Sequence, residues 1–75
     1  MKKKETLKVV NSRIRAIATE LEMTSDEFGQ DILGVTGTTY RNKLSGSNSW
    51  TLTDLIKIHE ASGHSFDYFF GLANY

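Results

Sequence analysis

The residues best suited to specific binding chemistry lie between Thr36 and Asn48. Thr38, Arg41 and Asn42 are three and four residues apart, so on a helix they share one face. Arginine pairs well with guanine, asparagine with adenine, and a threonine methyl group with thymine. This face therefore suits the reading of base edges in DNA, although its periodicity alone is equally typical of an ordinary solvated helix face.

Short polar or basic residues flank these three side chains. Such residues, together with backbone amides at a helix start, suit contacts with phosphate. The complete candidate DNA-binding set is Ser25, Thr36, Thr38, Thr39, Arg41, Asn42, Lys43, Ser45, Ser47 and Asn48.

Other chemistry finds little support. The chain contains no cysteine, and neither His59 nor His64 has a second potential metal ligand at helical spacing. Each is therefore interpreted as a structural or exposed histidine and not as part of a metal site. No serine lies in a nucleophile-elbow glycine pattern, and Gly34-x-x-Gly37 lacks the lysine of a phosphate-binding loop. We therefore expect no enzyme activity, metal, cofactor or small-molecule substrate.

The charge distribution qualifies the formal net charge of zero, which by itself argues mildly against a nucleic-acid partner. No acidic residue occurs from Ile32 to Thr53, whereas Arg41 and Lys43 lie inside that window. Local potential matters more to phosphate than the total charge does. A neutral chain can therefore still present an acid-free face to DNA.

Apolar spacing predicts one all-α domain, over residues 1–75. The first helix spans about residues 6–22. Thr24 or Ser25 caps the second helix, whose Gly29 allows a close approach and which ends at Gly34. Its inward residues are Phe28, Ile32 and Leu33.

Three further helices follow. Thr36 caps the third, over residues 37–45, after a turn of about three residues that is short enough for a steep angle. Thr51 caps the fourth, which Gly63 ends, and Ser65 caps a short fifth over residues 66–70. The buried stripe predicted for the fourth helix is Leu52, Leu55, Ile56 and Ile58.

The two ends of the chain are expected to be a flexible arm, 1–5, and a tail, 72–75. The Lys2-Lys3-Lys4 run could either contact a phosphate backbone or serve as a disordered end that increases solubility. The sequence predicts neither a secretory signal nor an apolar run of about 18 residues, so we expect a cytoplasmic protein without a membrane partner.

Aromatic residues are concentrated near the carboxy terminus. Phe66 is expected to anchor the fifth helix on the fourth. Phe69, Phe70 and Tyr75 are candidates for an interface with a second copy or a partner repressor. Completion of the monomer core is an equally good explanation for them.

The segment from Phe28 to Gly46 resembles the helix-turn-helix of phage repressor and Cro-type proteins. Leu33-Gly34-Val35-Thr36 is similar to the turn of that family, and Lys43-Leu44-Ser45-Gly46 to the end of its recognition helix in phages of Gram-positive bacteria. The resemblance continues through residues 50–58 and 67–71, and covers about residues 11–71. Gly29 fits the family pattern only with one extra residue before Gly34, and Gly37 takes the first exposed position of the recognition helix.

The resemblance implies a compact five-helix bundle of the lambda-repressor-like helix-turn-helix fold. It also implies a sequence-specific regulator of transcription that binds double-stranded DNA, a phage or prophage repressor or Cro-like protein that blocks polymerase by occlusion. The alternative is an antirepressor or co-repressor that docks on a partner repressor. The neutral charge and Gly37 favour this alternative.

Overall fold

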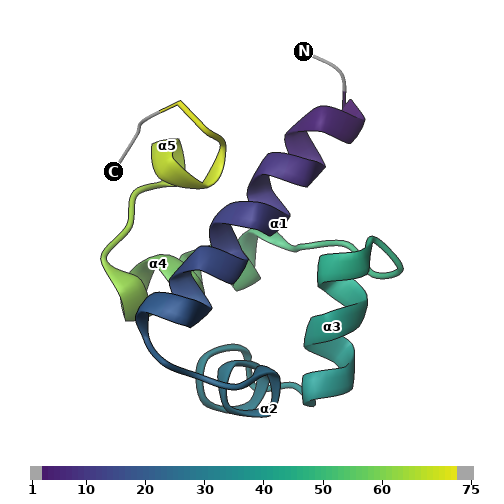
Figure 1. Cartoon of the computed structure of the whole chain (residues 1–75), viewed down its shortest axis with the longest axis vertical. Helices are drawn as coiled ribbons and strands as arrows, with labels where there is room; N and C mark the ends of the chain where they lie inside the picture. Colours follow the sequence, from purple (N-terminus) through teal and green to yellow (C-terminus); the bar gives the residue numbers. More distant parts are fainter. Residues whose placement is uncertain (1–2, 73–75) are drawn as a thin grey trace.

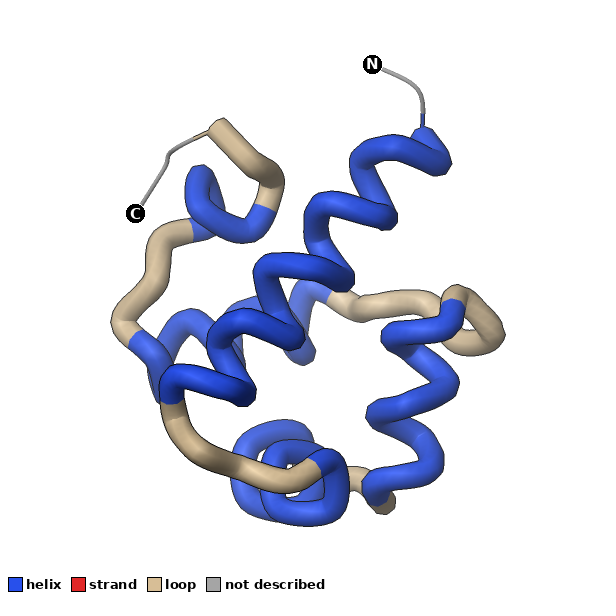
Figure 2. The backbone as a smooth tube through the Cα atoms, viewed as in Figure 1, coloured by secondary structure: helices blue, strands red, loops and turns tan. Residues whose placement is uncertain are grey.

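A computed structural model describes residues 3–72, and all the regular elements of that range are helical (Figures 1 and 2). For the described residues, the predicted all-α fold with five helices is therefore confirmed. The elements are α1 (Lys3–Glu20), α2 (Ser25–Glu27) continuing into the π-helix η1 (Phe28–Leu33), α3 (Gly37–Ser45), α4 (Leu52–Ser62) and α5 (Phe66–Phe69). Within the described range, no helix is long and apolar enough to cross a membrane.

Helix α1 is the centre of the arrangement. In Figure 1 it crosses the molecule diagonally, with α3 on one side of it, α5 on the other and α2 below. The largest fully buried side chains come from α1, η1, α4 and α5, so elements distant in sequence share one core. These side chains are Phe28, Phe69, Ile14, Ile17 and Ile58.

Local capping signals mark the helix starts as the sequence predicts. Thr24 and Glu27 form a capping box, and Thr51 and Asp54 form a second one. In each box the threonine hydroxyl accepts a hydrogen bond from a backbone amide, and the carboxylate accepts one from the threonine amide. Ser65 caps α5 in a similar way, through the amide of Tyr68.

The first helix differs from its predicted bounds at both ends. It begins at Lys3, so residues 3–5 belong to α1 and not to a separate arm, and it ends at Glu20. The chain then turns through Glu22, which adopts a left-handed conformation with φ of 56°. Residues 1–2 and the predicted tail beyond Leu72 lie outside the described range.

The second helix is regular for one turn only and then widens into η1. In a π-helix each backbone hydrogen bond spans five residues instead of the four of an α-helix, which accounts for the extra residue noted before Gly34. A Cβ atom on Gly29 would lie 2.9 Å from the Thr36 carbonyl oxygen and 3.1 Å from that of Val35. Glycine is therefore required where the backbone of the next turn passes over η1.

The buried stripe of α4 is narrower than predicted. Leu55 and Ile58 are buried, whereas Leu52 is 70% exposed and Ile56 40% exposed. Leu52 and Ile56 lie four residues apart and thus share a face, which the other described elements leave largely uncovered.

The aromatic residues near the carboxy terminus mainly complete the core. Phe69 is fully buried, so its assignment to an interface is wrong, and Phe70 packs half-buried against the core. Tyr75 lies outside the described residues. The ring of Phe66 lies 5.2 Å from that of His59, which confirms the expected contact between α5 and α4.

Candidate nucleic-acid interface

Helix α3 is fixed at both ends by local hydrogen bonds. The Thr36 hydroxyl accepts from the Thr39 amide at 3.1 Å, and the two threonine hydroxyls lie 3.0 Å apart. At the other end Gly46 is left-handed, and the Asn48 amide donates to the Asn42 carbonyl at 3.1 Å. The loop after α3 therefore folds back onto the last turn of the helix.

The inner side of α3 is held by an aromatic contact. Tyr40 is only 2% exposed, and its ring centroid lies 4.7 Å from that of Phe28 and 6.3 Å from that of Trp50. Burial raises the pKa of the Tyr40 hydroxyl, and the positive charge of Arg15 opposes this only in part. Trp50 in turn donates to the Asn11 side chain of α1 at 2.6 Å.

Lys43 is also on the inner side of α3, contrary to its predicted contact with phosphate. Its ammonium lies 2.8 Å from an Asp54 carboxylate oxygen, donates to the Ser49 carbonyl at 3.0 Å and lies 5.7 Å from the Trp50 ring centroid. Lysine and aspartate are both buried. Because the phosphate contact requires an exposed ammonium, Lys43 does not serve that role in this structure.

The pKa of Asp54 reflects this pairing. Burial pushes the pKa of the carboxyl upward, but hydrogen bonds from Lys43 and Thr51, with the lysine charge, outweigh burial and lower the pKa. The ion pair thus joins the last turn of α3 to the capping box of α4.

The predicted position of Gly37 also requires correction. It is buried at the start of α3, where an added Cβ atom would lie 2.9 Å from the Cα atom of Asp26. Gly37 is therefore a packing contact with α2, and Thr38 is the first exposed residue of α3.

The outer side of α3 carries polar side chains that the structure brings together. Arg41 donates to the Thr38 hydroxyl at 3.3 Å, and its guanidinium lies 3.9 Å from the Asp26 carboxylate. The side chains of Arg41 and Asp26 are 56% and 71% exposed, so solvent screens their attraction strongly. Asn42 is exposed on the same side of the helix.

The remaining candidates continue this surface into the loop. The Ser45 hydroxyl donates to the Asn42 carbonyl at 3.0 Å and lies 3.2 Å from the Ser47 hydroxyl. Of the predicted set, two residues are half-buried, Ser25 and Thr39, and Lys43 is buried. The exposed members are Thr36, Thr38, Arg41, Asn42, Ser45, Ser47 and Asn48.

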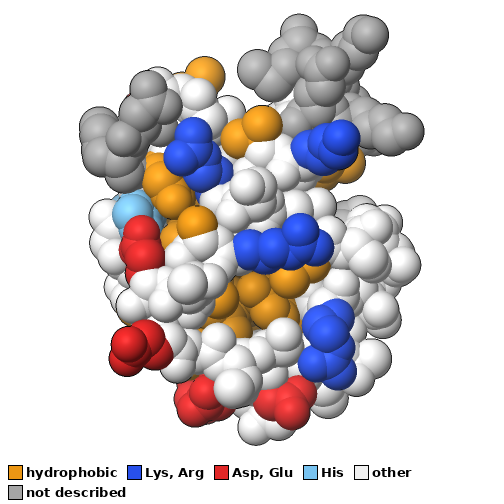
Figure 3. Space-filling view, viewed as in Figure 1, with side chains coloured by type: hydrophobic (Ala, Val, Ile, Leu, Met, Phe, Trp, Pro, Cys, Tyr) orange, Lys and Arg blue, Asp and Glu red, His pale blue; other side chains and the backbone are white. Residues whose placement is uncertain are grey.

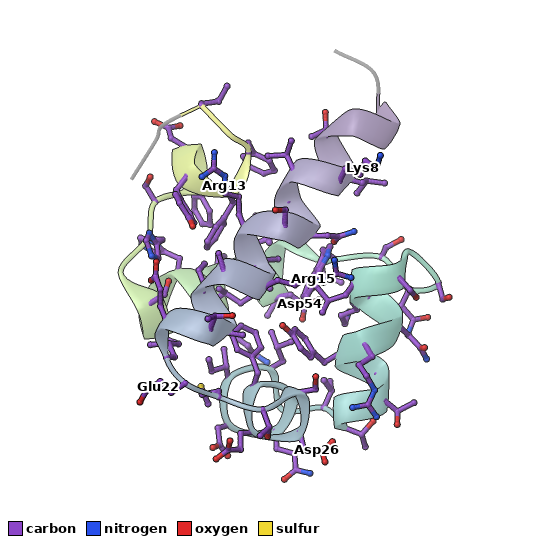
Figure 4. All side chains as sticks on the ribbon, viewed as in Figure 1. Lys8, Arg13, Arg15, Glu22, Asp26 and Asp54 are labelled. Carbon is purple, nitrogen blue, oxygen red and sulfur yellow. The ribbon has the colours of Figure 1, made fainter. Side chains whose placement is uncertain are left out.

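Arg15 is a neighbour of this surface that sequence reasoning missed. Figure 4 shows its side chain in the space between α1 and α3. Arg15 lies on the polar side of an amphipathic helix, and this position predicts that its side chain is exposed. Helical periodicity does not predict that α3 lies beside it. On the face that Figure 3 shows, basic groups lie over α1 and α3, whereas acidic groups lie along the lower edge and on the left flank beside a histidine.

Comparisons with protein-family models, curated proteins and solved structures gave no match to this chain. Among the described residues, no group of three or more histidine or acidic side chains is arranged to hold a metal ion.

Proposed function

We propose that the chain is a sequence-specific regulator that binds double-stranded DNA, with η1 and α3 forming a helix-turn-helix and α3 entering the major groove. The observation that carries the proposal is the two-sided character of α3. Tyr40 and Lys43 fix its inner side, while Thr38, Arg41 and Asn42 are exposed together on the outer side. A reading helix needs both a rigid mount and free hydrogen-bonding groups.

The roles of the exposed residues follow from their chemistry. Arg41 suits a bidentate contact with guanine and Asn42 one with adenine, while the Thr38 methyl suits thymine. Arg41 would exchange its weak contacts with Thr38 and Asp26 for the base.

Neutral donors would supply most of the contacts with the DNA backbone. Ser45, Ser47 and Asn48 lie exposed at the end of α3 and in the loop that follows it. Thr36 is exposed at the other end of the helix. Contacts from such groups position a protein on the duplex without reading its sequence. We propose occlusion of polymerase as the regulatory mechanism, in line with the resemblance to phage repressor and Cro-type proteins.

A selection experiment tests this function. Duplexes enriched from a random pool by the purified chain should share a short motif, and their binding should be compared with that of shuffled duplexes by fluorescence anisotropy at several salt concentrations. We expect specific affinity to exceed random affinity about 10³-fold or more. A pool that yields no motif, with equal affinity for shuffled DNA, would refute sequence-specific binding.

A second candidate function is regulation by docking on a partner repressor. The observation that favours it is the exposed pair Leu52 and Ile56 on α4, because adjacent uncovered apolar side chains on a small domain are typical of a protein interface. Charge reversal at Arg41 distinguishes the two. It should abolish DNA binding under the first function and leave repressor binding through α4 intact under the second.

A further inference from the structure

An open depression of about 540 Å³ lies along the exposed side of α1, next to α5. We name it the α1–α5 groove, and its lining residues are Lys8, Val9, Ser12, Arg13, Arg15, Ala16 and Tyr68. In Figure 1 α5 and α3 lie on opposite sides of α1, so the α5 end of the groove lies away from α3, and among the lining residues Arg15 is the one that also adjoins α3.

The groove has a strong charge asymmetry. Its lining contains three cations, Lys8, Arg13 and Arg15, and no acidic residue. None of the ion pairs among the described side chains includes any of the three. Figure 4 shows Lys8, Arg13 and Arg15 distributed along α1. A surface of this kind favours a negatively charged occupant.

The floor of the groove is formed by small side chains, some of which are apolar. Val9 and Ala16 are seven residues apart, with Ser12 between them, so they line one strip of α1. Small side chains in such a strip leave room for an element to pack against the helix. The groove therefore combines apolar contact area with flanking positive charges.

The wall on the α5 side is held in place by contacts between side chains. The Arg13 guanidinium lies 4.8 Å from the centroid of the Tyr68 ring, and His64 stacks on that ring at 4.1 Å. His64 also lies 2.8 Å from a Glu20 carboxylate oxygen. A site whose side chains are already ordered loses less conformational entropy on binding.

From these features we infer that the α1–α5 groove binds an acidic amphipathic segment of a partner protein. The apolar side chains of the segment would contact Val9 and Ala16, because the Tyr68 ring is buried beneath Arg13 and His64. The carboxylates of the segment would pair with the three cations. A DNA backbone provides the negative charge, but no apolar face to match the floor. The inference goes beyond DNA binding by α3 and does not depend on it.

The test uses a synthetic peptide of glutamate and leucine at helical spacing, with a control peptide carrying lysine for each glutamate. Titration into the ¹⁵N-labelled full chain at low salt should shift amide signals of α1 and α5, and the control peptide should shift none. Absence of shifts, or shifts confined to α3, would overturn the inference.

Two kinds of variant locate the site. Lys8→Glu/Arg13→Glu should weaken peptide binding roughly tenfold through the loss of two ion pairs with the peptide, one at exposed Lys8 and one at half-buried Arg13. Arg15 is left unchanged because it also adjoins α3. Ala16→Trp should block the groove without changing its charge, whereas Thr19→Trp, exposed on α1 outside the groove, should not. Circular dichroism melting checks that each variant remains folded.

DNA affinity supplies the independent readout. Arg41→Glu should abolish binding of the selected duplex and leave peptide binding unchanged. The groove variants should weaken peptide binding and leave binding of the selected duplex unchanged. If Lys8→Glu/Arg13→Glu impairs DNA binding and the peptide does not bind, the groove is a phosphate-contacting surface and the inference fails. Failure of DNA binding alone would refute only the function proposed for α3.

Discussion

Arg41 is the side chain whose replacement should separate specific from nonspecific DNA binding. Its two partners, Thr38 and Asp26, are both exposed, so a base edge can displace them at little cost. We expect Arg41→Ala to weaken binding of the selected duplex by about 1–3 kcal/mol and to relax preference at one base pair. Fluorescence anisotropy measures this, with Lys8→Ala, which removes an exposed cation of α1, as control. Equal losses on selected and shuffled DNA would instead assign Arg41 to phosphate.

The buried pair of Lys43 and Asp54 should act on stability. Removal of one partner leaves an uncompensated buried charge, so Lys43→Met should lower the free energy of unfolding by about 3 kcal/mol. Lys43→Met/Asp54→Asn should recover most of this loss, because the asparagine side chain can still accept from the Thr51 amide. Urea denaturation measures both variants. A single variant as stable as the wild type would show that the pair contributes nothing.

The lowered pKa of Asp54 gives a pH dependence of known sign. A carboxyl whose pKa is lower in the folded than in the unfolded chain stabilises the fold above its ordinary pKa of 3.8. That contribution is lost as the pH falls below 3.8 and through the lower pKa of the folded state. The difference in unfolding free energy between wild type and Asp54→Asn should therefore shrink between about pH 5 and pH 2. A constant difference would contradict the pairing.

Among the elements, η1 should tolerate a deletion that α1 cannot. Phe28 and Leu33 are both buried although they are five residues apart, a spacing that a π-helix brings to one side and an α-helix does not. Deletion of the exposed Gln30 makes the spacing four, which suits an ordinary α-helix. We expect the melting temperature of the Gln30 deletion variant to lie within roughly 5 °C of that of the wild type, which corresponds to a change of about 1 kcal/mol in the free energy of unfolding.

Deletion of Ala16 from α1 is the matched control. Ala16 is exposed like Gln30, but its loss rotates the preceding part of α1 relative to Ile17 and misplaces Ile14 and Val10. This variant should lose its cooperative melting transition. If the Gln30 deletion unfolds the chain as severely, the wide turn of η1 is required for the fold.

Helix α5 should contribute to stability mainly through Phe69. Phe69→Ala removes a fully buried ring and should cost about 3–5 kcal/mol, whereas Phe70→Ala, at a half-buried position, should cost clearly less. Thermal melts of the two variants provide the comparison. Similar losses would mean that Phe70 is as important to the core as Phe69.

The features that could be predicted from the sequence are those that depend on residues close together in the chain. Caps such as Thr36 and Thr51 act within one turn, so their function is visible in the residue order. The contact of Lys43 with Asp54 joins residues eleven apart in different helices, and a lysine at the end of a helix resembles any solvated lysine. The spacing of Phe28 and Leu33 did contain a signal for η1, which a template of α-helical periodicity overlooks.

For the molecule as a whole, DNA binding should depend only weakly on salt. Arg41 is the one cation among the exposed candidates on α3 and its loop, with Arg15 beside them, so few counterions are released on binding. We expect a slope of log affinity against log salt of about −1 to −2, at roughly −0.9 for each phosphate neutralised by one of these two cations. Anisotropy titrations measure it. A much steeper slope would require the other α1 cations to contact DNA as well.

The separation of charge in Figure 3 has a consequence for how the protein meets its target. On the face that Figure 3 shows, basic groups lie over α1 and α3 and acidic groups lie below and to the left of them, so charge is unevenly distributed on this face although the chain has no net charge. If the chain binds DNA as proposed, the duplex would attract the basic part of this face and repel the acidic part before contact, which would turn the basic part toward the duplex. A neutral protein would gain orientation during diffusion in this way, and would avoid the nonspecific retention along DNA that a large positive charge brings.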